Sequence, residues 1–357
     1  MTTPNAIALL LLGACMLADG PGAGRDARAS GPCYVALLHG SGPNLSDRGP
    51  GSAEMDRYWN PAGDPARSLA AAARSPERVS GKCVTAYVGY DGGVEWWHVR
   101  AAGRAAREIY EFIDAHHIPD GSLILIGHSM GGLVARYIVN NGAPEAPYYN
   151  EYAADDARMD YDLIRRKTSH IITVGAPHTG TEAADALAGE ADHDFSNRGV
   201  AVLKAIGVAR DSAANTSLTR AYMEAAGAPG GEMGDEGREV PIYTVAGTSP
   251  AAARAASPTR ADRRLELAWS MLCNQSGAVN LGGLACDRLL WDRHPVAGDG
   301  IVSRGSAHGF WTRAWPGPRP TIAGAYAAWL DQRENHSEGR YTAQASFLVD
   351  LTVHRAR

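Results

Sequence analysis

The amino-acid sequence predicts an α/β protein with a mostly parallel central sheet and helices on both of its faces. Short apolar runs end at a glycine or a polar turn, as buried parallel strands do. These runs are Tyr34–His39, Val84–Tyr90, Ser122–Gly127, His170–Gly175 and Pro241–Gly247. Between them, Trp96–His116 and Gly131–Asn141 have the periodicity and end signals of helices. Such an alternation is typical of a parallel sheet that helices cover on both sides.

Length and charge narrow the class of protein. A chain of 357 residues can bury a large core as one domain, or as one domain with a cap. Its formal net charge of −5 is mild, and the sequence contains neither a basic stripe nor an acidic block. We therefore expect no nucleic-acid partner.

Residues 1–30 read as a signal or lipoprotein-type leader with a linker, and residues 31–357 as the folded domain. The apolar run Ile7–Leu12 is too short to span a bilayer and resembles the core of a signal peptide. Leu12–Cys15 resembles a lipobox, at which cleavage leaves a lipidated cysteine. No Lys or Arg precedes the run, which points to an atypical signal or to a start codon placed too far downstream. We expect an extracytoplasmic protein, either secreted or anchored to a membrane surface through Cys15.

Four cysteines remain when Cys15 is set aside, and their positions favour disulfides. Cys33 and Cys83 each precede a predicted strand, and neighbouring parallel strands would bring them close enough to bridge. Cys273 and Cys286 would close a short loop. The alternative is a set of buried free thiols in a cytosolic protein. The even count and the signal-like start favour pairing.

Two segments interrupt the simple alternation. Residues 181–239 carry more helical pattern than one crossover helix needs, including an apolar stripe at Val200, Leu203, Ile206 and Val208. A helical cap over the site and extra helices packed on the sheet both fit this surplus. Residues 251–294 enclose Cys273 and Cys286 and are expected to form an irregular excursion.

The segment Gly127–Gly131 has the Gly-x-Ser-x-Gly pattern of a nucleophile elbow, with Ser129 as the candidate nucleophile. A serine hydroxyl needs a base to take its proton, and it must project clear of the backbone. The elbow achieves this with a tight turn whose flanking glycines remove clashing side chains. In a chain this rich in glycine the pattern alone is weak, but a predicted strand before it and a predicted helix after it supply the required context.

An oxyanion that develops at the attacked carbonyl needs hydrogen-bond donors already in place. One candidate is the backbone N–H of Met130, which follows the nucleophile. The other is the N–H of Ser41, in the loop Leu37–Gly42 after the first predicted strand. The alternative interpretation of His39-Gly40 is a tight turn with a structural histidine.

Several segments in chain order resemble the bacterial true lipases, the secreted triacylglycerol lipase family within the α/β hydrolases. They are Leu38–Gly40, Ile126–Gly132, Val174–Thr181 and Gly298–Ser303. The last two, with Gly-Ala-Pro-His and Asp-Gly-Ile-Val-Ser, are the more specific ones. The resemblance implies an α/β-hydrolase fold and a Ser–Asp–His triad in that chain order, with Asp299 as the acid.

The residues themselves indicate the acid and the base less specifically. Asp299 lies in a turn between glycines, where a carboxylate would orient an imidazole, although an ordinary turn aspartate also fits. Its rivals are Asp287 and Asp292. The base should follow the acid, which leaves His308, His336 and His354.

The resemblance favours His336 as the base. It matches the Asn-His segment that carries the family's base, whereas His308 matches a position that is not catalytic. His336 also lies in a polar loop before the helical pattern at Thr342–Leu351. The spacing from Asp299 is longer than in the family, and the Pro-rich piece Trp315–Pro320 accounts for it as an insertion.

These residues predict an exported serine ester hydrolase that acts on a lipid or another ester through an acyl-enzyme and requires no cofactor. The resemblance also implies that a structural calcium ion could bind near the acid loop, with Asp287 or Asp292 as ligands. His128 and His178 are expected to pack and to shape the loops rather than to transfer protons. A phospholipase, a thioesterase or a deacylase of lipid-linked glycans fits the same residues. The alternative outside catalysis is an envelope lipoprotein that uses the fold for binding.

Overall fold

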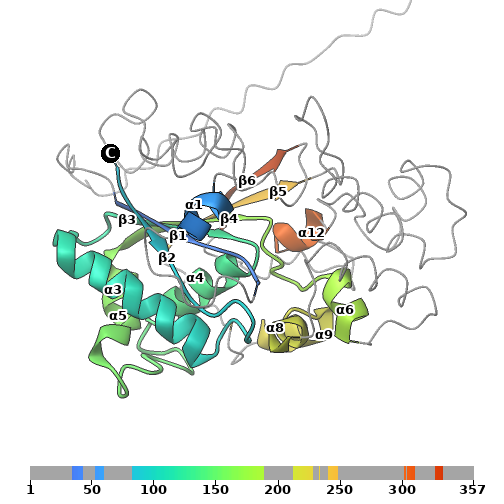
Figure 1. Ribbon diagram of the computed structural model, residues 1–357, viewed down its shortest axis with the longest axis horizontal. Helices are drawn as coiled ribbons and strands as arrows, with labels where there is room; N and C mark the ends of the chain where they lie inside the picture. Colours follow the sequence, from blue (N-terminus) through green and yellow to red (C-terminus); the bar gives the residue numbers. More distant parts are fainter. Residues whose placement is uncertain are drawn as a thin grey trace, which may run out of the picture.

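In the part of the chain that the computed structural model describes, six parallel strands form the central sheet (Figure 1). The model describes residues 34–42, 53–59, 83–188, 212–227, 233, 240–247, 301–302, 304–309 and 326–332. The strands are β1 (Tyr34–Leu38), β2 (Val84–Val88), β3 (Leu123–His128), β4 (Thr168–Val174), β5 (Ile242–Gly247) and β6 (Tyr326–Gln332). They lie in the order β2-β1-β3-β4-β5-β6. The predicted α/β class is confirmed.

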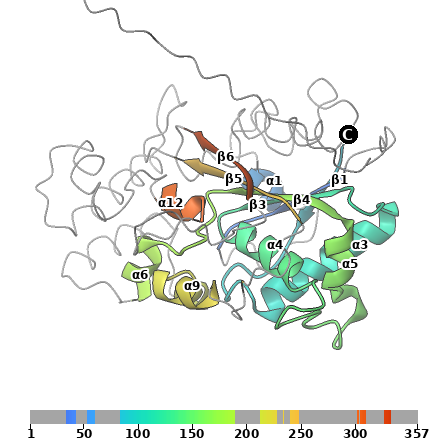
Figure 2. The same cartoon turned by 180° about the vertical axis from the view of Figure 1, so that it is seen from behind.

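Helices connect the described strands and flank the sheet (Figures 1 and 2). They are α1 (Ala53–Trp59), the π-helical turn η3 (Val99–Gly103), α3 (Arg104–His116), α4 (Met130–Asn140), the short η4 (Ala157–Met159), α5 (Tyr161–Lys167), α6 (Glu182–Ala188), α8 (Ala213–Ser217), α9 (Arg220–Ala226) and α12 (Arg304–Ala307). The three short helices α6, α8 and α9 pack against one another. They belong to residues 181–239, where a cap insertion stays a prediction.

Each face of the sheet has its own apolar cluster, because successive side chains of a strand point to opposite faces. On β1, Ala36 and Leu38 belong to the cluster that α3, α4 and α5 cover. Val35 and Leu37 belong to the opposite cluster, which contains Met55 and Trp59 of α1. Helices therefore lie on both faces, as the sequence predicts.

The helix predicted over Trp96–His116 is regular only in its second part. Trp96 is fully buried, and its indole N–H donates to the carbonyl of Ser217 at 2.9 Å. This contact turns the segment toward α8 before any helix begins. Val99–Gly103 then forms a π-helical turn, with the His98 side chain accepting from the Arg100 N–H at 3.0 Å. The ordinary helix begins at Arg104.

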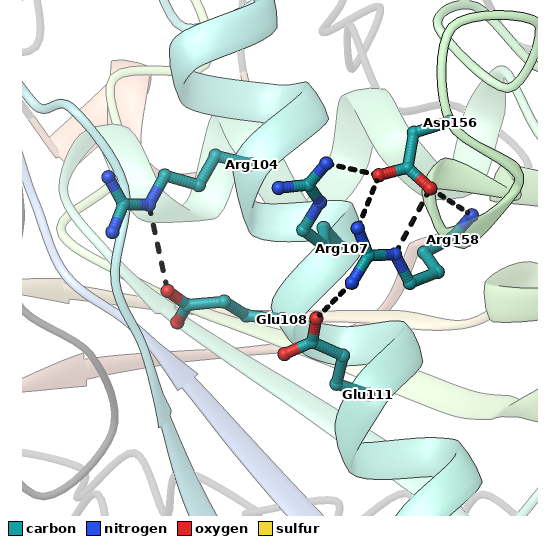
Figure 3. A network of polar contacts seen from close by, with 6 residues as sticks. All are labelled: Arg104, Arg107, Glu108, Glu111, Asp156 and Arg158. Carbon is teal, nitrogen blue, oxygen red and sulfur yellow. Dashed lines mark hydrogen bonds and ion pairs between the residues drawn. The ribbon is translucent and has the colours of Figure 1, made fainter.

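A polar network on the outer side of α3 ties it to η4 (Figure 3). Arg107 on α3 and Arg158 on η4 both contact the carboxylate of Asp156. Arg158 also contacts Glu111 at 3.1 Å. Hydrogen bonds from Arg158 hold the pKa of Asp156 well below its usual value, with a further contribution from Arg107. The network fixes the turn that leads into α5.

Cys83 directly precedes β2, where it is buried and disulfide-bonded. β1 and β2 are neighbours, with Tyr34 opposite Val84. Cys33, Cys273 and Cys286 lie outside the described residues, so both predicted pairings stay predictions. The leader at residues 1–30, the stripe from Val200 and the excursion at residues 251–294 also lie outside them. Within the described part of the chain, no helix has the length and apolar character needed to cross a membrane.

The order of connections reverses at β1, which lies between β2 and β3. In open parallel sheets a ligand binds outside the carboxyl ends of the strands at such a switch point. The loop His39–Gly42 leaves β1 at this edge, and Ser129 follows β3 at the same edge. The topology thus brings the two predicted site segments together.

Candidate active site

Ser129 occupies a sharp turn between β3 and α4. Its backbone has φ 55° and ψ −129°, a conformation that residues with a side chain rarely adopt. The Ser129 N–H donates to the carbonyl of Val174 at 2.9 Å, and the Ser129 carbonyl accepts from Gly132 at 3.0 Å. The residue is 7% exposed. This is the strained strand-to-helix geometry that a nucleophile elbow requires.

The two glycines of the elbow have no room for a side chain. A Cβ on Gly127 would lie 2.4 Å from the backbone nitrogen of Gly132. A Cβ on Gly131 would lie 2.4 Å from the carbonyl oxygens of His39 and Leu38. Backbone atoms cannot move aside as a flexible side chain does, so glycine is required at both positions.

The loop after β1 lies directly against the nucleophile turn. A Cβ on Gly40 would lie 2.8 Å from the Cβ of Ser129 and 3.3 Å from the carbonyl of His128. At its far end the loop is held by the Gly42 N–H, which donates to the carbonyl of Gly92 at 3.0 Å. The half-buried Ser41 lies between these two anchors.

The backbone N–H groups of Met130 and Ser41 lie near Ser129 and have no acceptor within the part of the chain that the structure describes. Met130 is the first residue of α4, so its N–H has no acceptor within the helix. No residue in the described ranges accepts a hydrogen bond from the Ser41 N–H. Of the predicted site residues, the structure therefore brings together Ser129, Met130 and the Ser41 loop.

His39 is a neutral, structural side chain of this loop. Its Nδ1–H donates to the carbonyl of Gly40 at 2.7 Å, and its Nε2 accepts from the Tyr90 N–H at 3.4 Å. Its ring stacks on the ring of Tyr90, with the centroids 4.0 Å apart. Burial lowers the pKa of His39 to about 4. His39 is therefore a structural histidine, and the loop that it shapes lies beside the nucleophile, so the two interpretations of His39-Gly40 are compatible.

Tyr58 of α1 is a site residue that the sequence does not reveal. Its hydroxyl accepts a hydrogen bond from the Gly40 N–H at 2.7 Å and lies 2.6 Å from Nδ1 of the buried His128. A Cβ on Gly40 would lie 2.9 Å from this oxygen. No motif marks Tyr58, and the only local signal is an aromatic pair, Tyr58-Trp59, after the loop.

The loop after β4 is tied to residues 301–309. The hydroxyl of Thr181 donates to the carbonyl of Ile301. The Ser306 hydroxyl donates to the carbonyl of Gly180 at 2.6 Å and accepts from the Thr179 N–H at 3.2 Å. Thr181 contacts a residue close after Asp299 in the chain, so the segment that follows the predicted acid is anchored beside β4.

Two buried histidines flank this contact. Nε2 of His178 lies 3.0 Å from the Thr173 hydroxyl, and Nδ1 of His308 lies 2.8 Å from the Thr244 hydroxyl. Burial lowers the pKa of His178 well below its usual value, and the charges of Arg136 and His308 add to this. His178 is therefore neutral and held against the end of β4.

The remaining predicted site residues lie outside the described residues. They are Asp299, His336, Asp287, Asp292 and His354. The structure thus gives no geometry for the acid, the base or the calcium ligands. Within the described ranges no three His, Cys, Asp or Glu side chains are grouped closely enough to hold a metal ion.

Strand order and a strained serine turn after β3 define the α/β-hydrolase fold, and comparisons with known proteins agree. Residues 97–190, which include the elbow, match the family described as the PGAP1-like alpha/beta domain. The mature form of a Bacillus licheniformis lipase superposes with a TM-score of 0.50 at 14% identity, over 91% of this chain and 94% of that one.

A lipase of Staphylococcus epidermidis is similar to part of the chain. The two are 30% identical over 120 residues, which cover 29% of this chain and 17% of the relative. The chain thus matches less than a fifth of that relative's length. Together the comparisons confirm a lipase-like α/β-hydrolase fold, as the sequence predicts.

Proposed function

We propose that the chain is a serine carboxylic-ester hydrolase of lipase or esterase type. Ser129 attacks the ester carbonyl, the alcohol leaves, and water then hydrolyses the acyl-enzyme. The observation that carries this proposal is the backbone of Ser129, strained at φ 55° and lying beside a glycine loop at the topological switch point. Such strain persists where function requires a residue to project from a turn.

The proposed base is His336 and the proposed acid is Asp299. His336 takes the proton of Ser129 and returns it to the leaving alcohol, while Asp299 orients the imidazole. The contact between Thr181 and Ile301 supports a position of the acid turn near β4. A base directs Nδ1–H at the acid carboxylate, whereas Nδ1 of the alternative, His308, contacts the Thr244 hydroxyl. This contact favours His336.

The proposed oxyanion donors are the backbone N–H groups of Met130 and Ser41. Met130 follows Ser129, and Ser41 follows Gly40, which contacts Ser129. Neither N–H group donates to another group within the described residues, so both can bind an oxyanion. Donors that are already oriented stabilise the tetrahedral intermediates of both acylation and deacylation. The chemistry requires no cofactor.

The proposed substrate is a lipid or another carboxylic ester, and the local match to a staphylococcal lipase supports it. A phospholipase, a thioesterase or a deacylase of lipid-linked glycans would use the same residues. We also propose an exported protein, secreted or held at a membrane surface through a lipidated Cys15. The disulfide-bonded state of Cys83 favours an oxidising compartment.

Hydrolysis of short-chain p-nitrophenyl esters by two matched serine variants tests the proposal. Ser129→Ala is expected to lower kcat/KM by at least about a thousandfold, because the nucleophile is lost. Ser169→Ala is the control: Ser169 lies at the opposite edge of the sheet, where its hydroxyl donates to the carbonyl of Leu123 at 3.0 Å. Its rate should match that of the wild type. Equal rates for Ser129→Ala and the wild type would exclude Ser129 as the nucleophile and favour a binding protein.

A further inference from the structure

One hydroxyl group lies between the two segments that carry the proposed oxyanion donors. Tyr58 contacts Gly40, which precedes Ser41, and His128, which precedes Ser129 and Met130. The two contacts are 2.7 and 2.6 Å long. Gly40 and His128 are far apart in the chain, so the hydroxyl links a loop after β1 to the end of β3.

The chemistry of the groups fixes the direction of one of the two hydrogen bonds in this link. A backbone N–H only donates, so the Tyr58 oxygen accepts from Gly40. The Tyr58 hydroxyl donates to Nδ1 of His128 in one tautomer of the imidazole and accepts from Nδ1–H in the other, so the two residues are hydrogen-bonded in both. One hydroxyl thus holds both segments by hydrogen bonds, as the acceptor from Gly40 and as the partner of His128.

The hydroxyl is held in place by the helix that carries it. On α1, Met55 and Trp59 are fully buried in the apolar cluster on the face of the sheet that contains Val35. The Tyr58 ring makes edge contacts with the rings of His39 and His128, at centroid distances of 5.9 and 5.8 Å. A phenylalanine ring would fill the same space but would leave the Gly40 N–H without its acceptor.

From this geometry we propose that Tyr58 is a positioning residue, which sets the spacing between the Ser41 and Met130 N–H groups. The inference rests on the proposed hydrolase function. Donors stabilise an oxyanion only when they stand within a few tenths of an ångström of the productive arrangement. Without the hydroxyl, the Gly40 N–H loses its acceptor while the Gly40 carbonyl keeps its hydrogen bond from His39, so the adjacent Ser41 N–H is held less firmly in place. Substrate binding in the ground state does not depend on these donors to the same degree.

Tyr58→Phe separates transition-state stabilisation from substrate binding. We expect kcat for p-nitrophenyl butyrate to fall by about 10- to 100-fold, with KM changed by less than about threefold. The inhibition constant of butylboronic acid, which forms a tetrahedral adduct with a serine nucleophile, should rise by a similar factor. A residue that only packs would not move kcat and the boronate constant together.

Tyr152→Phe is the matched control. It also loses one hydroxyl hydrogen bond, from Tyr152 to the carbonyl of Trp97 at 3.1 Å, away from the elbow. Its kcat and boronate constant should equal those of the wild type. A Tyr58→Phe enzyme with wild-type kcat, or one in which only KM or thermal stability changes, would overturn the proposed role of Tyr58. A wild-type chain without serine-dependent hydrolysis would overturn the hydrolase function itself, and this role with it.

Discussion

The carbonyl oxygen of His39 lies against Gly131, so closely that a Cβ on Gly131 would stand 2.4 Å from it. The loop proposed to bind the oxyanion and the helix that follows Ser129 therefore meet backbone to backbone. This contact fixes how far apart the two proposed donors can lie.

Gly131→Ala is the first prediction from this contact. The added methyl group must push the His39 loop or the start of α4 aside, so we expect a loss of about 1–3 kcal/mol in the free energy of unfolding. Ester hydrolysis should fall by about 100-fold or more, because the donors move apart. Urea unfolding and initial rates measure the two effects. Wild-type values for both would mean that the contact relaxes without consequence.

The raised pKa of Glu108 leads to a second prediction, that the stability of the protein depends on pH. Its carboxylate accepts from the Gly89 N–H at the end of β2 and lies 3.7 Å from Nε of Arg104 (Figure 3). Burial raises the pKa of Glu108 to about 7, against smaller opposing contributions from Gly89 and Arg104. The folded protein therefore binds the proton more tightly than the unfolded chain, whose pKa is 4.5. The corresponding stabilisation is complete below about pH 4.5 and is lost as the pH rises through 7.

Glu108→Gln removes this ionisation but keeps an oxygen that accepts from Gly89. We expect the variant to become more stable than the wild type as the pH rises, by roughly 1–3 kcal/mol between pH 5 and pH 8. Urea unfolding at a series of pH values measures the difference. Parallel stability profiles for the two proteins across this range would contradict a raised pKa at Glu108.

The ion pairs of Asp156 lead to a third prediction, that their contribution to stability depends on salt. Its carboxylate contacts both Arg107 and Arg158, and it accepts from the Arg158 N–H at 3.0 Å (Figure 3). Asp156→Ala should lower Tm by about 1–3 °C at low salt, and the difference should shrink in 1 M NaCl because the pairs are partly exposed. Asp162→Ala, which breaks the surface pair with Arg166, is the control and should change Tm less. A Tm difference that salt leaves unchanged would argue against an electrostatic origin.

The disulfide at Cys83 gives a fourth prediction. Since Tyr34 and Val84 are opposite each other in neighbouring strands, we expect the partner of Cys83 to be Cys33. Digestion without reductant should release a linked peptide that contains both cysteines. Cys83→Ser should lower the free energy of unfolding by about 2–4 kcal/mol, which equilibrium unfolding can measure. A linked peptide that joins Cys83 to Cys273 or Cys286 would contradict this pairing.

The central strands could be predicted from the sequence because burial on both faces makes them continuous apolar runs. β3, with Leu-Ile-Leu-Ile, is an example. β4 begins earlier than predicted, at Thr168, because its first residues are polar and pair beside Leu123. β6, with the sequence Tyr-Ala-Ala-Trp-Leu-Asp-Gln, was missed because it lacks β-branched residues and alternation. β6 forms because it pairs with β5 at the edge of the described sheet, and its own residues have little preference for a strand.

In the site, too, features that consecutive residues determine could be predicted, whereas contacts between distant segments could not. Ser129 could be predicted because strand, glycines and helix are consecutive in the chain. Tyr58 could not be predicted, because its importance comes from contacts with Gly40 and His128, which only the folded chain brings together. The short helix α1 that carries it has no sequence pattern strong enough to mark it.

Covalent labelling with a fluorophosphonate tests the central claim most directly. The reagent reacts with a serine whose hydroxyl is activated by a base and whose oxyanion is stabilised. Mass spectrometry of the labelled protein and of its peptides measures the number of adducts and their position. The account predicts one adduct per chain, on Ser129, and none on the Ser129→Ala protein. An unlabelled wild-type protein, or an adduct on another serine that persists in Ser129→Ala, would contradict it.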